Sequence, residues 1–272
     1  MSVSRLMQMA ASGAGGKTWD LAYASYDGVS FDVSPQDNFT SGVSFKTDGT
    51  KMYVVGSGGQ EVNEYNLSTA WDVSSASYQS TKSLGSVFAA YGIYFRPDGT
   101  MFFVVIFESD RVEKYVLGTP WNITTASKSG EYSVTSQDSN PAGVFLKPDG
   151  TKMYVTGTGN DRIYEYDLST AWTLGDSVSF TQQFSVQGEE LNPRGLHFKD
   201  DGSKVFLAGS SGQDINEYAL NTPWDISTAS YTQNFSVSSQ GTAPFDLYIS
   251  PDGDKMFTVD ASALRVFQYS IG

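Results

Sequence analysis

Cysteine is absent from the 272-residue sequence, and histidine occurs once, as His197. Without cysteine the chain has no disulfides, no thiolate nucleophile and no cysteine-ligated zinc or iron–sulfur centre. A single histidine excludes a histidine-cluster metal site and makes any Ser-His-Asp triad depend on His197 alone. We therefore expect no metal and no cofactor.

Basic residues are also few. The chain has 17 lysines and arginines against 30 aspartates and glutamates, which gives a formal net charge of −13. A chain this acidic repels phosphate backbones and anionic membrane surfaces. No apolar run approaches the roughly 18–20 residues that span a bilayer. We therefore expect no nucleic-acid partner and no membrane insertion.

A helical period of 3.6 residues persists nowhere, but a much longer repeat does. Five tryptophans and five Asp-Gly turn dipeptides recur at intervals of 50 to 52 residues, the tryptophans at Trp19, Trp71, Trp121, Trp172 and Trp224. In the third copy, short apolar or alternating segments at residues 143–146, 153–156, 163–168 and 178–186 are separated by turn-forming residues. Four antiparallel strands in about 50 residues are typical of a propeller blade. The sequence therefore predicts an all-β fold, a single five-bladed β-propeller.

The phase of the repeat predicts how the ring closes. The propeller begins with a fourth-type strand within residues 19–33 and ends after a third-type strand at residues 266–269. We expect the N-terminal strand to complete the last blade; an open array, or a ring completed by a second chain, is the alternative. Residues 1–18 are predicted to be a separate N-terminal attachment arm, and residues 19–272 the propeller. Leu6, Met7 and Met9 are the apolar anchors with which the arm would bind a partner.

The loops from strand four to the next strand one, and from strand two to strand three, open on one face of a propeller, and loops often carry function. Charged side chains in these loops are candidate ligand-binding groups: Asp110, Arg111, Asp161, Arg162, Glu190 and Arg194. They could hydrogen-bond a ligand or form an ordinary solvated rim.

Asp246 and Asp260 are a sharper candidate, because three other copies have glycine at both corresponding positions and the second copy has Gly92 and Ile106. We expect the two carboxylates to lie close together at the mouth of the central channel, where a cation, a shared proton or a hydroxylated ligand would relieve their repulsion. Two exposed aspartates in water are the alternative. The start of strand one is otherwise Gly42, Gly92, Gly143 and Gly195, which argues against a glycosidase with carboxylates from several blades. His197 aligns with Ser44, Tyr94, Phe145 and Tyr248 and is interpreted as a core histidine, so no catalytic residue is assigned.

The phrases at residues 148–155 and 163–168 resemble blades of the YVTN-like β-propeller repeat class. Residues 67–78 are similar to repeats in structural proteins of tailed phages and marine viruses. The resemblance implies a non-enzymatic structural and binding module of a phage virion, associated with a tail or fibre. Its arm would contact other virion proteins, and its loop face would meet a host-surface glycan or protein receptor. A free extracellular, lectin-like carbohydrate-binding propeller is the alternative, and an enzyme would rest on Asp246 and Asp260 alone.

Overall fold

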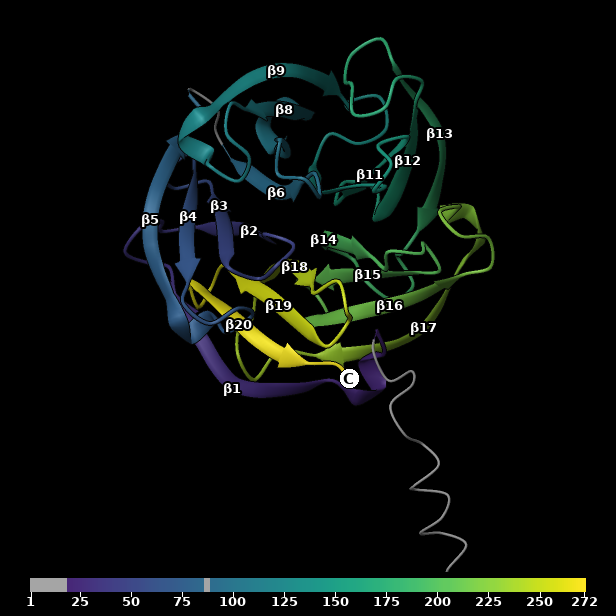
Figure 1. Cartoon of the computed structure of the whole chain (residues 1–272). Coiled ribbons are helices and arrows are strands. Elements are labelled where there is room, and N and C mark those ends of the chain that lie inside the picture. Colours follow the sequence, from purple (N-terminus) through teal and green to yellow (C-terminus); the bar gives the residue numbers. More distant parts are fainter. Residues whose placement is uncertain (1–18, 86–88) are drawn as a thin grey trace, which may run out of the picture.

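A computed structural model describes residues 19–85 and 89–272. Within these residues the chain forms five antiparallel sheets of four strands each, arranged as the blades of a propeller (Figure 1). Strands β2, β6, β14 and β18 lie near the centre of the ring, and β5, β9, β13, β17 and β1 lie at its outside. The prediction of a five-bladed all-β propeller is therefore confirmed.

Each blade is built from consecutive strands, except the last. Blade 1 comprises β2 (Thr40–Phe45), β3 (Lys51–Gly56), β4 (Glu61–Leu67) and β5 (Ala76–Ser83). Blade 2 comprises β6 (Ala90–Phe95), β7 (Met101–Ile106), β8 (Arg111–Leu117) and β9 (Ala126–Ser133). Blade 3 comprises β10 (Pro141–Leu146), β11 (Lys152–Gly157), β12 (Arg162–Leu168) and β13 (Val178–Ser185). Blade 4 comprises β14 (Pro193–Phe198), β15 (Lys204–Gly209), β16 (Asp214–Leu220) and β17 (Ala229–Ser236). Blade 5 comprises β18 (Pro244–Ile249), β19 (Lys255–Asp260), β20 (Arg265–Ser270) and, from the N-terminal part, β1 (Ser25–Asp32).

The N-terminal strand closes the ring as the repeat phase predicts. β1 pairs antiparallel with β20, from Ser25 opposite Ser270 to Asp32 opposite Arg265. The last blade therefore has its fourth strand, and no unpaired edge is left between the two ends of the ring. The proposed arm and its anchors Leu6, Met7 and Met9 lie outside the described residues, so attachment through them stays a prediction.

The described helices are five three-residue 3₁₀ turns: η1 (Leu21–Tyr23), η2 (Val73–Ser75), η3 (Phe107–Ser109), η4 (Ile123–Thr125) and η5 (Ile226–Thr228). In the described part of the chain, none is long and apolar enough to cross a bilayer.

The repeated tryptophans pack against the Asp-Gly turns of their own blades. In blade 3, Gly150 has φ +76°, and a Cβ there would collide with the Trp172 indole. The backbone N–H of Trp172 donates to the Gly150 carbonyl at 3.0 Å. The tryptophan thus covers a turn that only glycine allows, which explains why the two signals recur in step.

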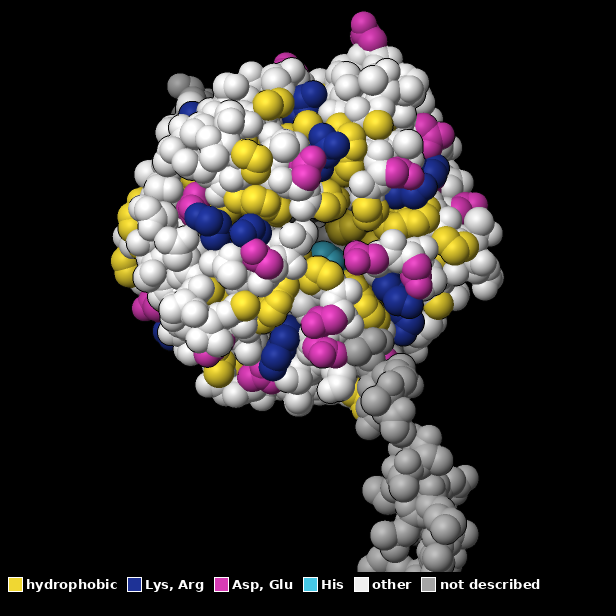
Figure 2. Space-filling view, in the orientation of Figure 1, with side chains coloured by type: hydrophobic (Ala, Val, Ile, Leu, Met, Phe, Trp, Pro, Cys, Tyr) yellow, Lys and Arg dark blue, Asp and Glu magenta, His cyan; other side chains and the backbone are white. Residues whose placement is uncertain are grey.

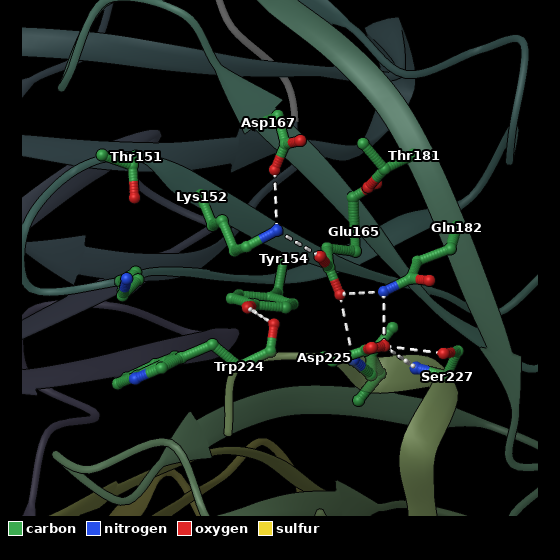
Figure 3. Close-up of polar contacts among 12 residues, drawn as sticks. Thr151, Lys152, Tyr154, Glu165, Asp167, Thr181, Gln182, Trp224, Asp225 and Ser227 are labelled. Carbon is green, nitrogen blue, oxygen red and sulfur yellow. Dashed lines mark hydrogen bonds and ion pairs between the residues drawn. The ribbon is translucent and has the colours of Figure 1, made fainter. Parts of the chain in front are cut away.

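Neighbouring blades are joined by a buried carboxylate (Figure 3). In blade 3, Lys152 pairs with Glu165 at 2.6 Å, and Glu165 Oε2 accepts the Ile226 N–H of blade 4 at 2.9 Å. Gln182 Nε2 bridges Glu165 Oε2 at 2.8 Å and Asp225 Oδ1 at 2.7 Å. We call such a boundary between two blades a junction. Corresponding backbone bonds at other junctions run from Ile123 to Glu64, from Leu21 to Glu217 and from Val73 to Gln268.

Candidate functional site

A cavity of about 380 Å³ occupies the channel at the centre of the ring. All five inner strands line it, together with one residue from each turn that follows them: Thr47, Pro97, Pro148, Asp200 and Pro251. It therefore opens on the face of the Asp-Gly turns, which is opposite the loop face selected from the sequence. Figure 2 shows this hollow, with hydrophobic side chains around it and the chain's single histidine at its centre.

One position on each inner strand forms the wall of the cavity. The five residues at this position are Ser44, Tyr94, Phe145, His197 and Tyr248. The His197 ring centroid lies 5.0 Å from that of Tyr248 and 5.3 Å from that of Phe145. No hydrogen-bond partner of His197 is present in the described part of the chain. Burial lowers the pKa of His197 to about 3. At neutral pH the imidazole is therefore uncharged and keeps one N–H to donate.

Two tyrosines add hydroxyl groups to this wall. Burial raises the pKa of both Tyr94 and Tyr248. The neighbouring Tyr248 and then Asp200 raise the pKa of Tyr94 further, and the charge of Asp200 does the same for Tyr248. Neither hydroxyl has a hydrogen-bond partner among residues 19–85 and 89–272. Burial also raises the pKa of Asp200, which stands where three other blades have proline. The cavity thus contains hydrogen-bond donors that the fold itself does not use.

Asp246 lies at the inner end of the cavity and is 4% exposed. Its Oδ2 accepts the Val43 N–H at 3.0 Å, its Oδ1 accepts the Leu247 N–H at 2.9 Å, and the Ile93 N–H also donates to this carboxyl. Burial raises the pKa of Asp246 to about 8, because the loss of solvation outweighs these three backbone bonds. Asp246 is thus a carboxyl group that exchanges its proton near neutral pH.

The glycines at the starts of the inner strands leave room for only this side chain. A Cβ at Gly195 would collide with the Asp246 carboxylate, and a Cβ at Gly92 would press on the backbone of Ala142 and Gly143. The blades approach one another too closely at this level for five side chains. One carboxylate therefore closes the channel and forms the floor of the cavity.

The expected pairing of Asp246 with Asp260 is not formed. A bulge in β18 places Asp246 opposite Val259, while Asp260 lies opposite Pro244. The Asp260 carboxylate accepts loop N–H groups from Ala243, Ser262 and Ala263 at 2.8–2.9 Å. The two aspartates share no backbone donor. Of the two, only Asp246 lines the cavity.

Asp260 accepts loop N–H groups, as a loop carboxylate does in other blades. Asp37, Asp138 and Glu190 each accept N–H groups of the loop between strands two and three, with Gly56, Gly157 and Gly209 close beside them. In blade 5 the two residue types are exchanged, so that Gly241 stands at the loop position and Asp260 at the strand position. Glu190, a sequence candidate, is in this structural set and is 1% exposed.

The other candidates lie at the opposite ends of the strands from the cavity. Asp110 ends η3 with φ +47° and accepts the Thr135 hydroxyl at 3.2 Å, and Arg111 pairs with Glu113 at 2.8 Å. Asp161 has φ +52°. The half-buried Arg162 follows it at the start of β12. Ligand binding by these four stays a prediction.

Arg194 completes the set of sequence candidates. Its guanidinium carbon lies 4.1 Å from the centroid of the Phe245 ring, and its Nε donates to Ser210 Oγ at 3.3 Å. Burial lowers the pKa of Arg194. This contact packs Arg194 onto an aromatic ring away from the cavity, and a ligand role stays a prediction.

Tyr94, Tyr248 and Asp200 are not among the site residues predicted from the sequence, and His197 was predicted to lie in the core. A usable signal was present: packing positions such as the tryptophans repeat in every blade, whereas the cavity position carries four different residue types in five copies. Among the described residues, no group of three or more acidic or histidine side chains is arranged to hold a metal ion.

Two solved structures share the fold. A functionally unknown protein from Desulfotomaculum acetoxidans aligns with a TM-score of 0.51 at 14% identity, covering 81% of this chain and 65% of that protein. A putative 6-phosphogluconolactonase from Bacteroides uniformis aligns with a TM-score of 0.51 at 16% identity, covering 84% and 65% respectively. The chain thus spans slightly under two thirds of the length of either protein. No curated protein matches the sequence.

The family comparison corrects the functional expectation. A family model described as "Lactonase, 7-bladed beta-propeller" matches residues 31–223, which is well over half of the chain. It gives no support to the YVTN-like class or to a viral affiliation. The expectation of a non-enzymatic virion module, with a lectin as its alternative, is therefore wrong, as is the expectation that the protein is not an enzyme. The chain belongs to the family of lactonase β-propellers, although its described residues form five blades where the family description has seven.

Proposed function

We propose that the protein is a hydrolase that opens a lactone bound in the central cavity, with Asp246 as the general base. The observation that carries this proposal is the single buried carboxyl group at the cavity floor, whose pKa is raised to about 8. A general base works best when its pKa lies near the working pH. Membership of the lactonase family supports a cyclic ester as substrate.

The lining of the cavity favours an uncharged substrate. None of its lining residues is lysine or arginine, and most are hydrophobic or aromatic. A phosphate group would find no cation there, since phosphate recognition relies on arginine, lysine or clustered backbone N–H groups. A volume of about 380 Å³ suits one small ring compound. The substrate class is therefore a neutral lactone without a phosphate group.

The proposed reaction uses Asp246 first as a base and then as an acid. The Asp246 carboxylate takes a proton from a water molecule while the water oxygen attacks the lactone carbonyl carbon. The His197 N–H and the tyrosine hydroxyls donate to the oxyanion that forms, as donors preset for developing charge do. The tetrahedral intermediate then breaks the ring C–O bond, and Asp246 returns its proton to the leaving alkoxide. The product is the open-chain hydroxy acid.

Titration of the acid released from δ-valerolactone tests this proposal. Asp246→Asn should lower the enzymatic rate by about 10²-fold or more, the usual range for loss of a general base. Asp260→Asn is the matched control, because it makes the same chemical change in the same blade outside the cavity. Unchanged hydrolysis in Asp246→Asn, or no hydrolysis of any neutral lactone in a panel of ring sizes, would contradict the proposal.

A further inference from the structure

One junction lacks the side chain that fills the same place at two others. At the junction of blades 3 and 4, Gln182 bridges two acceptors across the boundary, as described above (Figure 3). At the next junction Gln233 Nε2 does the same, bonding Glu217 Oε2 at 2.9 Å and Asp20 Oδ1 at 2.7 Å. A glutamine amide is therefore the standard bridge of these two junctions.

Ser80 holds the corresponding position at the junction of blades 1 and 2. It lies opposite Glu64 in the strand pairing, as Gln182 lies opposite Glu165. A serine is too short to reach across, and its hydroxyl has no hydrogen-bond partner among residues 19–85 and 89–272. A groove of about 410 Å³ remains, lined by Glu64, Ser80 and Asn122, with Trp121 as an apolar wall. We call it the junction groove.

The two acceptors in the junction groove keep the bonds that their counterparts make. Asn122 Oδ1 accepts the Thr124 N–H at 3.1 Å, as Asp225 accepts that of Ser227 at 3.1 Å. Glu64 Oε2 accepts the Ile123 N–H at 3.3 Å, and the other oxygen pairs with Lys51. Each of these oxygens has a counterpart that also accepts a glutamine N–H. Asn122 Oδ1 also accepts the Thr124 hydroxyl at 2.7 Å, and its counterpart Asp225 Oδ1 accepts the Ser227 hydroxyl at 2.6 Å and still takes the Gln182 amide as a third donor. The junction geometry therefore admits a further donor at this position.

We infer that the junction groove binds the primary carboxamide of a small ligand, whose NH₂ group bridges Glu64 Oε2 and Asn122 Oδ1. The body of the ligand rests on Trp121. The charge balance favours this neutral donor over an ammonium group: Lys51 already pairs with Glu64, and Asn122 is uncharged where three of the other four junctions have aspartate. The inference is independent of the lactonase proposal.

The other two junctions are built differently. At the junction of blades 2 and 3, Glu131 stands opposite Glu113 and pairs with Lys128 at 2.7 Å. At the junction of blades 5 and 1, the amide of Gln268 donates to Asp27 at 2.9 Å. The bridging position is therefore filled by a glutamate at the first of these junctions and by Val29, opposite Gln268, at the second, which leaves the junction groove as the unfilled place among the described junctions.

Propionamide is a suitable probe, because it is the glutamine side chain from Cβ outward. In a titration of ¹⁵N-labelled protein followed by NMR, it should shift the Ile123 amide signal in a saturable way. Ser80→Gln should abolish this shift and raise Tm by about 2 °C, since the chain then supplies one more bridging amide. Gln182→Ser should create a second saturable site, reported by the Ile226 amide.

N,N-dimethylpropionamide is the control ligand, because it has the same carbonyl and no N–H. Binding of this compound as strong as that of propionamide would overturn the proposal. The same holds for tighter binding of propylammonium, or for an undiminished propionamide shift in Ser80→Gln. Failure of Gln182→Ser to gain a site would show that the bridging geometry does not recognise a free amide, and would also overturn it.

Discussion

The blade junctions and the central cavity are built from the same five repeats, but they differ in how far the residue at a repeat position is kept from blade to blade. Between the sheets, one residue type recurs at a given position, as with the buried tyrosines Tyr65, Tyr115, Tyr166, Tyr218 and Tyr269. On the cavity wall the repeat position differs from blade to blade. Each junction is a contact between two blades only, so that the same packing residue can serve at each of them. All five blades contribute to one cavity at the axis. This cavity can contain acid, base and hydrogen-bond donor groups only if the blades carry different residues there.

The largest expected effect in this comparison is the pH dependence of the free energy of unfolding that proton binding by Asp246 causes. Its pKa is about 8 in the folded protein and about 3.9 in an unfolded chain, so the folded state binds the extra proton between these values. The contribution of this group to stability is therefore full below pH 4 and is lost as the pH rises to about 8. The loss is on the order of 5 kcal/mol. Urea denaturation of wild type and Asp246→Asn across pH 4–9 measures it.

The same titration should act on activity with the opposite sign. If Asp246 is the base, the rate of lactone hydrolysis should rise with pH and level off above about 8, after subtraction of the hydroxide-catalysed background. A stability difference between the two proteins that does not vary with pH would show that the carboxyl is not buried as described.

Breaking a junction should be costly for folding and neutral for the cavity. Glu165→Ala removes one of the two carboxylates that pair with Lys152 and leaves the buried Ile226 N–H without its acceptor. We expect a loss of about 3 kcal/mol in the free energy of unfolding. Glu165→Gln should lose only about 1 kcal/mol, because Gln268 already accepts the Val73 N–H with an amide at 3.1 Å. Denaturation curves give both values; a fall in the activity per folded molecule of Glu165→Gln would contradict the separation of the two regions.

The sequence predicts the repeated region far better than the cavity. Asp-Gly turns, tryptophans and alternating strands are local signals, so the number of blades and the closure by β1 could be derived from their spacing. The position of Asp246 depends on a bulge in β18 that shifts the pairing by one residue, and no local pattern reveals it. The exchange of Gly241 and Asp260 likewise becomes visible only in the structure, where the loop residue and the strand residue lie side by side.

The error about function has a physical origin in the same contrast. The prediction of a non-enzymatic module rested on the repeated phrases of the sequence, and the residues that repeat are the ones that pack. Among the residues that differ, His197 was assigned to the core because the residues that align with it in the other copies, such as Phe145 and Tyr248, are mostly packing residues. Burial and chemical use coincide at these positions, since the channel is both the core of the ring and its cavity.

Replacing His197 by phenylalanine separates its packing from its chemistry. Phe145 occupies the same position in blade 3, so the variant should keep the free energy of unfolding within about 1 kcal/mol. Loss of the N–H donor should lower kcat by roughly 10²-fold. The pH–rate profile of the wild type should show no inflection near 6.5, because burial holds the pKa of His197 at about 3. An unchanged kcat in His197→Phe would show that the histidine only packs in the cavity wall and does not take part in catalysis.

The smallest effect should come from a single tyrosine hydroxyl. Tyr248 packs edge-on against His197 and stacks on Trp71 with ring centroids 6.1 Å apart, contacts that phenylalanine preserves. Because Tyr94 offers a second hydroxyl to the same cavity, Tyr248→Phe should lower kcat/KM by no more than about tenfold, which is about 1.4 kcal/mol of barrier. Tyr94→Phe should behave alike, and the double variant should lose more than the product of the two single effects, since neither hydroxyl can then replace the other. Strictly multiplicative losses would mean that each hydroxyl meets a different part of the substrate. No loss in the double variant would leave the oxyanion to His197 alone.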